Sequence, residues 1–254
     1  MTTEGELMAL FKKKKQLDSS SMKNGVGLIT VTKPTSSIAE QFRTIRTNVQ
    51  FSSADRQLKT LLFTSADPSE GKSTISANVA VTWADQGNKV LLIDSDLRRP
   101  AVARSFRVSN SQGLTTILTA KQANLSESIH ETEVPNLYVL PSGPVPPNPS
   151  ELLNSSKMDQ LLKVLKEQFD IIILDVPPVN KVTDAQILAS KVDGVILVVP
   201  QGIALKGAVL RARDLLKKVN ANLIGAVLNR VTDAASGGYY GGYYGGYYGT
   251  DDKK

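Results

Sequence analysis

The residues best suited to chemistry lie in one short segment, Ala66-Asp-Pro-Ser-Glu-Gly-Lys-Ser-Thr74, between an apolar run and a helical pattern. In a turn of this kind, backbone N–H groups and the N-terminus of the following helix point at phosphate oxygens. Lys72 has the reach to contact the terminal phosphates of a nucleotide, and the Ser73 hydroxyl suits a Mg²⁺ ion. Gly71 lets the backbone approach the phosphate closely. The segment therefore predicts a phosphate-binding loop.

The segment departs at one position from the usual pattern, G-x-x-x-x-G-K-[ST], because Ala66 stands where the first glycine is expected. The alternative is a chance Gly-Lys-Ser sequence in an ordinary strand-to-helix turn. The flanking strand and helix patterns favour the binding loop. The loop residues expected to contact nucleotide are Ala66, Asp67, Pro68, Ser69, Glu70, Gly71, Lys72, Ser73 and Thr74.

Three carboxylates stand at the ends of predicted apolar strands. Asp94 and Asp96 end the run Val90-Leu-Leu-Ile-Asp-Ser-Asp, and Asp175 ends the run Ile171-Ile-Ile-Leu-Asp. The spacing of Asp94 and Asp96 puts both side chains on the same side if the strand persists. In a parallel sheet these strand ends share the edge where ligands bind, and Mg²⁺ prefers carboxylate oxygens. A single such aspartate is usually a cap, but three in this order predict a Mg·nucleotide site.

Short apolar runs alternate with helical patterns along most of the chain, which argues for right-handed β–α–β units. The runs at 171–174 and 195–199 contain only Val, Ile and Leu, as expected of strands buried on both faces. We expect an α/β fold of the P-loop NTPase type, with a mostly parallel sheet and helices on both faces. The predicted strands are 59–65, 89–94, 136–141, 170–175, 194–199 and 223–229, and the predicted helices are 34–51, 72–85, 149–168, 183–191 and 205–219.

Composition excludes several kinds of active site. The 254 residues contain no Cys, which excludes thiol nucleophiles, disulfides and Cys-ligated zinc. The single His, His130, lies in the polar stretch SESIHETE, and we expect it on the surface rather than in a catalytic triad. The net charge of +6 proves no partner, and no stretch interleaves basic and aromatic residues as a nucleic-acid platform does. We therefore expect no nucleic-acid partner.

No apolar stretch reaches the roughly 20 residues that a membrane helix needs, because Pro200 and Gln201 interrupt the longest one. Lys12 to Lys15 are not followed by an apolar segment, so the N-terminus lacks the pattern of a secretory signal. We expect a cytoplasmic chain. The lysine run is typical of a solvated face, and contact with anionic lipid or a membrane-bound partner is the alternative.

The C-terminal region has an unusual composition, because six of the seven tyrosines lie in the run YYGGYYGGYYG. Such a low-complexity segment buries little and stays flexible. We expect three parts: a flexible basic arm over residues 1–33, one folded domain over 34–235, and a disordered tyrosine-cluster tail over 236–254.

These motifs in combination resemble the bacterial tyrosine kinase family of capsule and exopolysaccharide systems, from about residue 35 to the C-terminus. The loop at 66–74 resembles the family's Walker A motif, which commonly lacks the first glycine. Residues 91–98 resemble its second Walker motif, D-x-D-x-R, and residues 171–175 resemble Walker B. Glu40-Gln-Phe-Arg-Thr-Ile-Arg46 matches the family's E-x-x-R-x-x-R helix, and residues 142–152 resemble its Pro-rich segment. The tail is similar to the family's tyrosine cluster.

The resemblance implies a non-membrane-spanning protein-tyrosine kinase that uses ATP and Mg²⁺. It implies that Lys72 and Ser73 hold phosphate and metal, with Asp96 and Asp175 supporting the metal, and that Lys72, Asp94 and Asp96 are catalytic. Asp94 would orient the attacking phenol and accept its proton late, since an ordinary carboxylate is a poor base for a phenol of pKa about 10.

The resemblance also assigns the tail, whose tyrosines would be phosphorylated in trans. An adhesive tail, or one whose aromatic rings stack on a partner, is the alternative. Asn229, at the end of the last predicted strand, is suited to the adenine edge, although an ordinary turn residue is nearly as good an interpretation. The expected acceptors are Tyr239, Tyr240, Tyr243, Tyr244, Tyr247 and Tyr248.

Glu40, Arg43 and Arg46 lie on one broad face of their predicted helix. Spacing alone indicates an exposed helix with an ion pair worth a few tenths of a kcal/mol, whereas the resemblance implies a subunit contact in a homo-oligomeric ring. It further implies a membrane adaptor of the polysaccharide co-polymerase type, which recruits and activates the kinase, and a cognate tyrosine phosphatase. The function implied is regulation of capsule or exopolysaccharide synthesis and export.

A different class of function is an ATPase switch similar to ParA and MinD, whose cycle controls assembly on a membrane partner. Those proteins carry an extra lysine at the second position of the loop, where this chain has Asp67. The tail separates the two functions, because a switch has no need of six clustered tyrosines.

Overall fold

The computed structural model describes residues 21–52, 58–121 and 124–231. A seven-stranded sheet forms its centre, with strand order β3-β4-β2-β5-β1-β6-β7. All neighbouring strands are parallel except β3 and β4, which are antiparallel. The strands are β1 (Thr60–Ser65), β2 (Val90–Asp94), β3 (His130–Glu131), β4 (Leu137–Leu140), β5 (Ile171–Asp175), β6 (Gly194–Pro200) and β7 (Leu223–Asn229).

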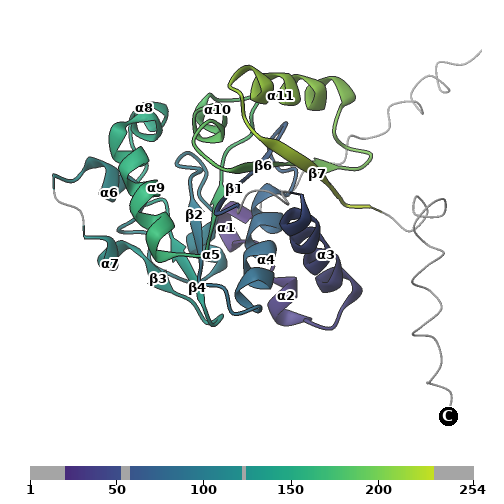
Figure 1. Ribbon diagram of the computed structural model, residues 1–254, viewed down its shortest axis with the longest axis horizontal. Coiled ribbons are helices and arrows are strands. Elements are labelled where there is room, and N and C mark those ends of the chain that lie inside the picture. The colour runs from purple at the N-terminus through teal and green to yellow at the C-terminus, as the bar shows by residue number, and fades with distance from the viewer. Residues whose placement is uncertain (1–20, 53–57, 122–123, 232–254) are drawn as a thin grey trace, which may run out of the picture.

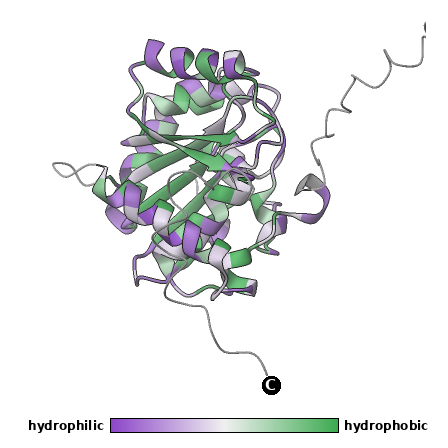
Figure 2. Ribbon diagram, turned by 90° about the vertical axis from the view of Figure 1, so that its right-hand side faces the viewer, coloured by the Kyte–Doolittle hydropathy of each residue, from purple (hydrophilic) through white to green (hydrophobic). Residues whose placement is uncertain are grey.

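Helices cover both faces of the sheet, as Figure 1 shows. Each face has its own cluster of buried apolar side chains, and Figure 2 shows apolar strands between helices whose outer surfaces are hydrophilic. On one side lie α2 (Ile29–Thr32), α3 (Ser37–Phe51), α4 (Lys72–Ala84) and α5 (Val102–Ser105), and α1 (Ser21–Asn24) adjoins α5. On the other lie α6 (Leu114–Thr119), α7 (Leu125–Ser128), α8 (Pro149–Asn154), α9 (Ser156–Gln168), α10 (Asp184–Ala189) and α11 (Lys206–Lys218).

The central strands β1, β2 and β5 are completely buried, which explains the apolar runs at 61–63, 90–93 and 171–174. All three run parallel and pair directly, in the order β2-β5-β1. Their carboxyl ends therefore meet at one edge of the sheet, where the loop before α4 also lies. The predicted α/β fold with a mostly parallel sheet is confirmed.

The six predicted strands are present, and the structure adds β3, which is too short to give a sequence pattern. His130 lies opposite Val139 in β3, which is an edge strand of the sheet, and its side chain is half-buried. The predicted helix over 149–168 is two helices. Ser155 separates them in an extended conformation, and its hydroxyl accepts the N–H of Met158 to cap α9.

The last residues of the expected N-terminal arm contact the domain. Val26 N–H donates to Ser105 Oγ (2.9 Å), and the Thr30 hydroxyl donates to Asn78 Oδ1 (2.9 Å). The Asn78 amide in turn donates to Gly27 O (2.9 Å). Residues 25–32 are thereby attached to α4 and α5, on the N-terminal side of the boundary proposed at residue 33. Within the described ranges, no helix is long and apolar enough to cross a membrane.

Candidate active site

The loop between β1 and α4 has the conformation that a phosphate site needs. Gly71 precedes α4 with φ +95°, a backbone angle that favours glycine. A Cβ atom at this position would lie 2.1 Å from Nδ2 of Asn229. Ala66, in the place of the usual first glycine, is fully buried, so the loop begins inside the core. Backbone conformation and close packing together explain why residue 71 is glycine.

Side chains hold this loop in place without a ligand. Asn229 Nδ2 donates to Glu70 O (3.0 Å), which ties the end of β7 to the loop. The Glu70 carboxylate folds back and accepts the N–H of Asp67 (3.0 Å), and burial raises the pKa of Glu70. The structure thus brings Asn229 to the loop. Its contact with adenine stays a prediction.

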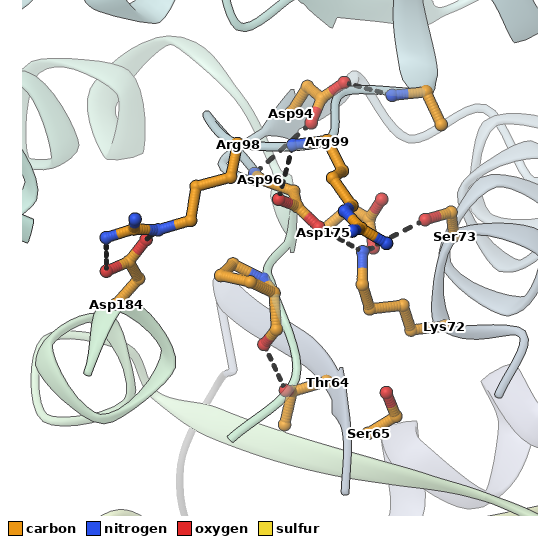
Figure 3. Close-up of polar contacts among 12 residues, drawn as sticks. Thr64, Ser65, Lys72, Ser73, Asp94, Asp96, Arg98, Arg99, Asp175 and Asp184 are labelled. Carbon is orange, nitrogen blue, oxygen red and sulfur yellow. Dashed lines mark hydrogen bonds and ion pairs between the residues drawn. The ribbon is translucent and has the colours of Figure 1, made fainter. Parts of the chain in front are cut away.

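Lys72 begins α4 and is surrounded by the predicted carboxylates (Figure 3). Its Nζ lies 3.0 Å from Asp96 Oδ2, 3.4 Å from Asp175 Oδ1 and 3.2 Å from Ser73 Oγ. Burial opposes the charged form, but the two carboxylates outweigh it and raise the pKa of Lys72. The ammonium is therefore held in its charged form at the edge of the sheet.

Asp175 has a free acceptor in this site. The residue is fully buried, and its Oδ2 atom has no hydrogen-bond partner among the described residues. Burial raises the pKa of Asp175, and the positive charge of Lys72 offsets part of that rise. An orphaned carboxylate oxygen near the Ser73 hydroxyl fits a Mg²⁺ ion, which binds through one or two carboxylates, water and substrate phosphates. In the part of the chain that the structure describes, no three acidic or His side chains form a metal cage.

Asp94 is also completely buried, but it faces a different set of groups. Its Oδ2 accepts the N–H groups of Ala101 (3.0 Å) and Val102 (2.9 Å), and its Oδ1 accepts that of Asp96 (3.3 Å). Burial, reinforced by the charge of Asp175, raises the pKa of Asp94 to about 7. Asp94 thus stabilises the turn after β2 by accepting its backbone N–H groups. Its charge interacts with that of Asp175 in the active site.

Asp94, at the end of β2, and Asp96, in the turn that follows, therefore point to different partners, as Figure 3 shows. β2 ends at Asp94, so the regular alternation that would put Asp94 and Asp96 on one side does not continue. Asp96 pairs with Lys72, whereas Asp94 binds the turn backbone. The proposed proton acceptor is enclosed here by backbone N–H groups.

An ion pair between the exposed Arg98 and the buried Asp184, behind the site, was not predicted from the sequence. Arg98 Nε lies 2.9 Å from Asp184 Oδ2, and Asp184 is fully buried. The Ser150 hydroxyl also donates to Asp184. This cluster joins the turn after β2 to α8 and α10. The D-x-D-x-R pattern marked Arg98, but its partner is 86 residues away and had no signal beyond its place at a helix start.

A cavity of about 630 Å³ opens above the loop. Lys72, Ser73 and Asp96 line it, together with residues that the sequence analysis did not assign. Among these, Lys181 forms an ion pair with Asp67 (3.1 Å) at the rim. An ammonium group therefore lies beside the second loop position, although it comes from the segment after β5.

The three charged residues of α3 make contacts inside the chain. Arg43 binds Glu40 (2.8 Å) and Pro34 O (2.8 Å), which confirms the ion pair expected from spacing. Arg46 donates to Thr82 O of α4 (2.7 Å). Burial lowers the pKa of Arg46, with a further contribution from Arg43. The subunit contact stays a prediction, and the six tail tyrosines lie outside the described residues.

The family described as "AAA domain" matches residues 59–224. The tyrosine-protein kinase YwqD of Bacillus subtilis is 44% identical over 215 residues, which is 84% of this chain and 90% of that protein. The chain belongs to the bacterial tyrosine kinase family. The kinase domain of the Escherichia coli tyrosine kinase ETK superposes with a TM-score of 0.79 at 31% identity, covering 96% of this chain and 93% of that domain.

A more distant likeness concerns the alternative function. The cell division ATPase MinD of Pyrococcus furiosus superposes with a TM-score of 0.58 at 29% identity, over 67% of this chain and 71% of that one. This kinase therefore shares its P-loop NTPase-like sheet with MinD. The second loop position, Asp67, is acidic and paired with Lys181.

Proposed function

We propose that this kinase transfers the γ-phosphoryl group of ATP to tyrosines of the C-terminal cluster of another copy of the chain. The observation that carries the proposal is the buried set of Lys72, Asp96 and Asp175 at the loop before α4, in a chain with six clustered tyrosines. We further propose that this reaction regulates capsule or exopolysaccharide synthesis and export.

In the proposed reaction, the bond between the γ-phosphorus and the β–γ bridging oxygen of ATP breaks. The phenolic oxygen of tyrosine forms the new bond to that phosphorus, and the phenol loses its proton, giving ADP and phosphotyrosine. Lys72 and the N-terminus of α4 bind phosphate oxygens, and Ser73 with Asp175 would hold Mg²⁺. Mg²⁺ supplies positive charge that offsets the negative charge of the phosphates.

Asp94 is proposed as the group that accepts the tyrosine proton. A pKa of about 7 suits that task better than an ordinary carboxylate does. Its Oδ2 atom accepts the N–H groups of Ala101 and Val102, and its Oδ1 atom accepts that of Asp96, so the turn between β2 and α5 has to release at least one of these oxygens when tyrosine enters. Asp94→Asn should retain Mg·ATP binding and lose phosphoryl transfer.

A mixed-chain labelling experiment tests the function and the trans reaction together. One chain carries Lys72→Met with an intact tail, and the other carries six Tyr→Phe changes with an intact site. Both are incubated with Mg²⁺, γ-labelled ATP and the cytoplasmic segment of the adaptor, followed by mass spectrometry. Label on the tail of the Lys72→Met chain supports the proposal. ATP hydrolysis without tail label, in the mixture and in the wild-type chain, would favour the MinD-like switch.

The proposed tail reaction has an electrostatic consequence. Each phosphotyrosine carries about −1.5 to −2 charges at pH 7, so six would place roughly −9 to −12 on the tail. That charge disfavours renewed docking and promotes dissociation of the proposed ring. We also propose that a membrane adaptor recruits the kinase to the inner face of the membrane, and that a tyrosine phosphatase reverses the modification. Light scattering before and after the reaction tests the dissociation.

A further inference from the structure

The cavity above the phosphate loop is lined by several cationic side chains, and one of them differs from the rest. Among the described residues these are Lys72, Arg98, Arg99, Lys181 and Arg230. Four of them already have acceptors. Arg99 is the exception, because its guanidinium forms no hydrogen bond or ion pair with any residue that the structure describes.

The acceptors of the other four account for their positions. Lys72 is shared by two carboxylates, Arg98 is bound to Asp184, and Lys181 is bound to Asp67. Arg230 makes a long contact of 3.5 Å with the carbonyl of Ser69. Since the charge of Lys72 is shared with Asp96 and Asp175, a phosphate bound beside it would gain from a further cation.

Arg99 is positioned by the same carboxylate that pairs with the loop lysine. Its backbone N–H donates to Asp96 Oδ1 (3.0 Å), while Asp96 Oδ2 contacts Lys72 (3.0 Å). The neighbouring arginines then diverge, as Figure 3 shows: Arg98 extends away to Asp184, and Arg99 turns toward Asp175 and Lys72. Asp96 thus fixes the backbone of Arg99 beside the phosphate site. The side chain of Arg99 remains available to bind an anion.

We propose that Arg99 contacts the phosphoryl group during its transfer, an inference that rests on the proposed kinase reaction. A guanidinium presents paired N–H donors that match phosphate oxygens. Such a contact stabilises the charge that is spread over the equatorial oxygens in the transition state. Arg98, the arginine of the D-x-D-x-R pattern, has instead a structural role at Asp184.

Three chains are compared: wild type, Arg99→Ala and Arg99→Lys. Each is measured for the initial rate of tail labelling, for Mg·ADP affinity, and for the gain in ADP affinity when aluminium fluoride mimics the transferring phosphoryl group. We expect Arg99→Ala to lower the rate by about 10²–10³-fold, to change Mg·ADP affinity less than about threefold, and to lose most of the aluminium fluoride gain. Arg99→Lys should recover only part of both.

Arg104→Ala is the matched control, because Arg104 is an exposed arginine of α5 that does not line the cavity. The inference would be overturned if Arg99→Ala labelled the tail at the wild-type rate. It would also be overturned if Arg99→Ala lost labelling rate and Mg·ADP affinity by the same factor. Absence of label from the wild type concerns the proposed kinase reaction. In that case the aluminium fluoride gain alone decides the role of Arg99, and an unchanged gain in Arg99→Ala refutes it.

Discussion

Replacing Gly71 by alanine should separate backbone strain from close packing, because the chain contains a matched glycine. Gly71 and Gly87 have φ angles of +95° and +87°, so alanine at either position is strained by about 1–2 kcal/mol. A Cβ at residue 87 meets nothing within 4 Å, whereas one at residue 71 meets Asn229 Nδ2 at 2.1 Å. Asn229 must then move away and lose its hydrogen bond to Glu70, at a further cost of about 1 kcal/mol.

We therefore expect Gly71→Ala to lower the free energy of unfolding by about 2–3 kcal/mol, and Gly87→Ala by about 1–2 kcal/mol. Only Gly71→Ala should also weaken Mg·ADP binding, because it displaces the phosphate-binding loop. A loss of about 1.4 kcal/mol of binding free energy lowers the affinity tenfold, so we expect a decrease of tenfold or more. Urea unfolding can be followed through Trp83, the single and buried tryptophan, with a nucleotide titration in parallel.

The double variant Gly71→Ala/Asn229→Ala tests the cause. Since Asn229→Ala removes the atom that the new Cβ meets, the double variant should be less destabilised than the sum of the single variants by about 1 kcal/mol. Equal unfolding midpoints and equal nucleotide affinities for Gly71→Ala and Gly87→Ala would refute the packing argument. Strict additivity in the double variant would refute the role assigned to Asn229.

Three further predictions follow from buried charges. The pKa of Asp94 is about 7 in the folded chain and 3.8 ordinarily, so the folded state binds the extra proton and its free energy of unfolding should fall as pH rises from about 4 to about 7. Asp94→Asn should flatten this slope in urea unfolding at several pH values; an unchanged slope would contradict it. Arg98→Ala should lower the free energy of unfolding by about 2 kcal/mol, because the buried Asp184 loses its ion pair. The double variant Arg98→Ala/Asp184→Asn should regain most of that free energy, which chemical unfolding measures. Arg46→Ala should lower the free energy of unfolding by about 1.5 kcal/mol through its lost bond to Thr82, which calorimetry measures, and no change in Tm would argue against that bond.

Local sequence patterns determined most of the strands and the phosphate loop. Fully buried strands require unbroken apolar runs, and parallel strands place their carboxyl ends at one edge. The predicted meeting of Lys72, Asp96 and Asp175 is therefore found in the structure. The break at Ser155 was not predicted, although the polar residues at 154–157 interrupt the apolar pattern there and include the serine that caps the next helix.

Only the tertiary structure decided which partner each charged side chain takes. Asp94 and Asp96 are two residues apart, yet the turn after β2 presents N–H groups to one and Lys72 to the other. Adjacent arginines likewise diverge, because Asp184 reaches Arg98 from a distant helix and leaves Arg99 directed at the phosphate site. Sequence by itself determined the chemical groups and the sheet edge at which they gather. Their individual partners depend on contacts between segments far apart in the chain, which no local pattern encodes.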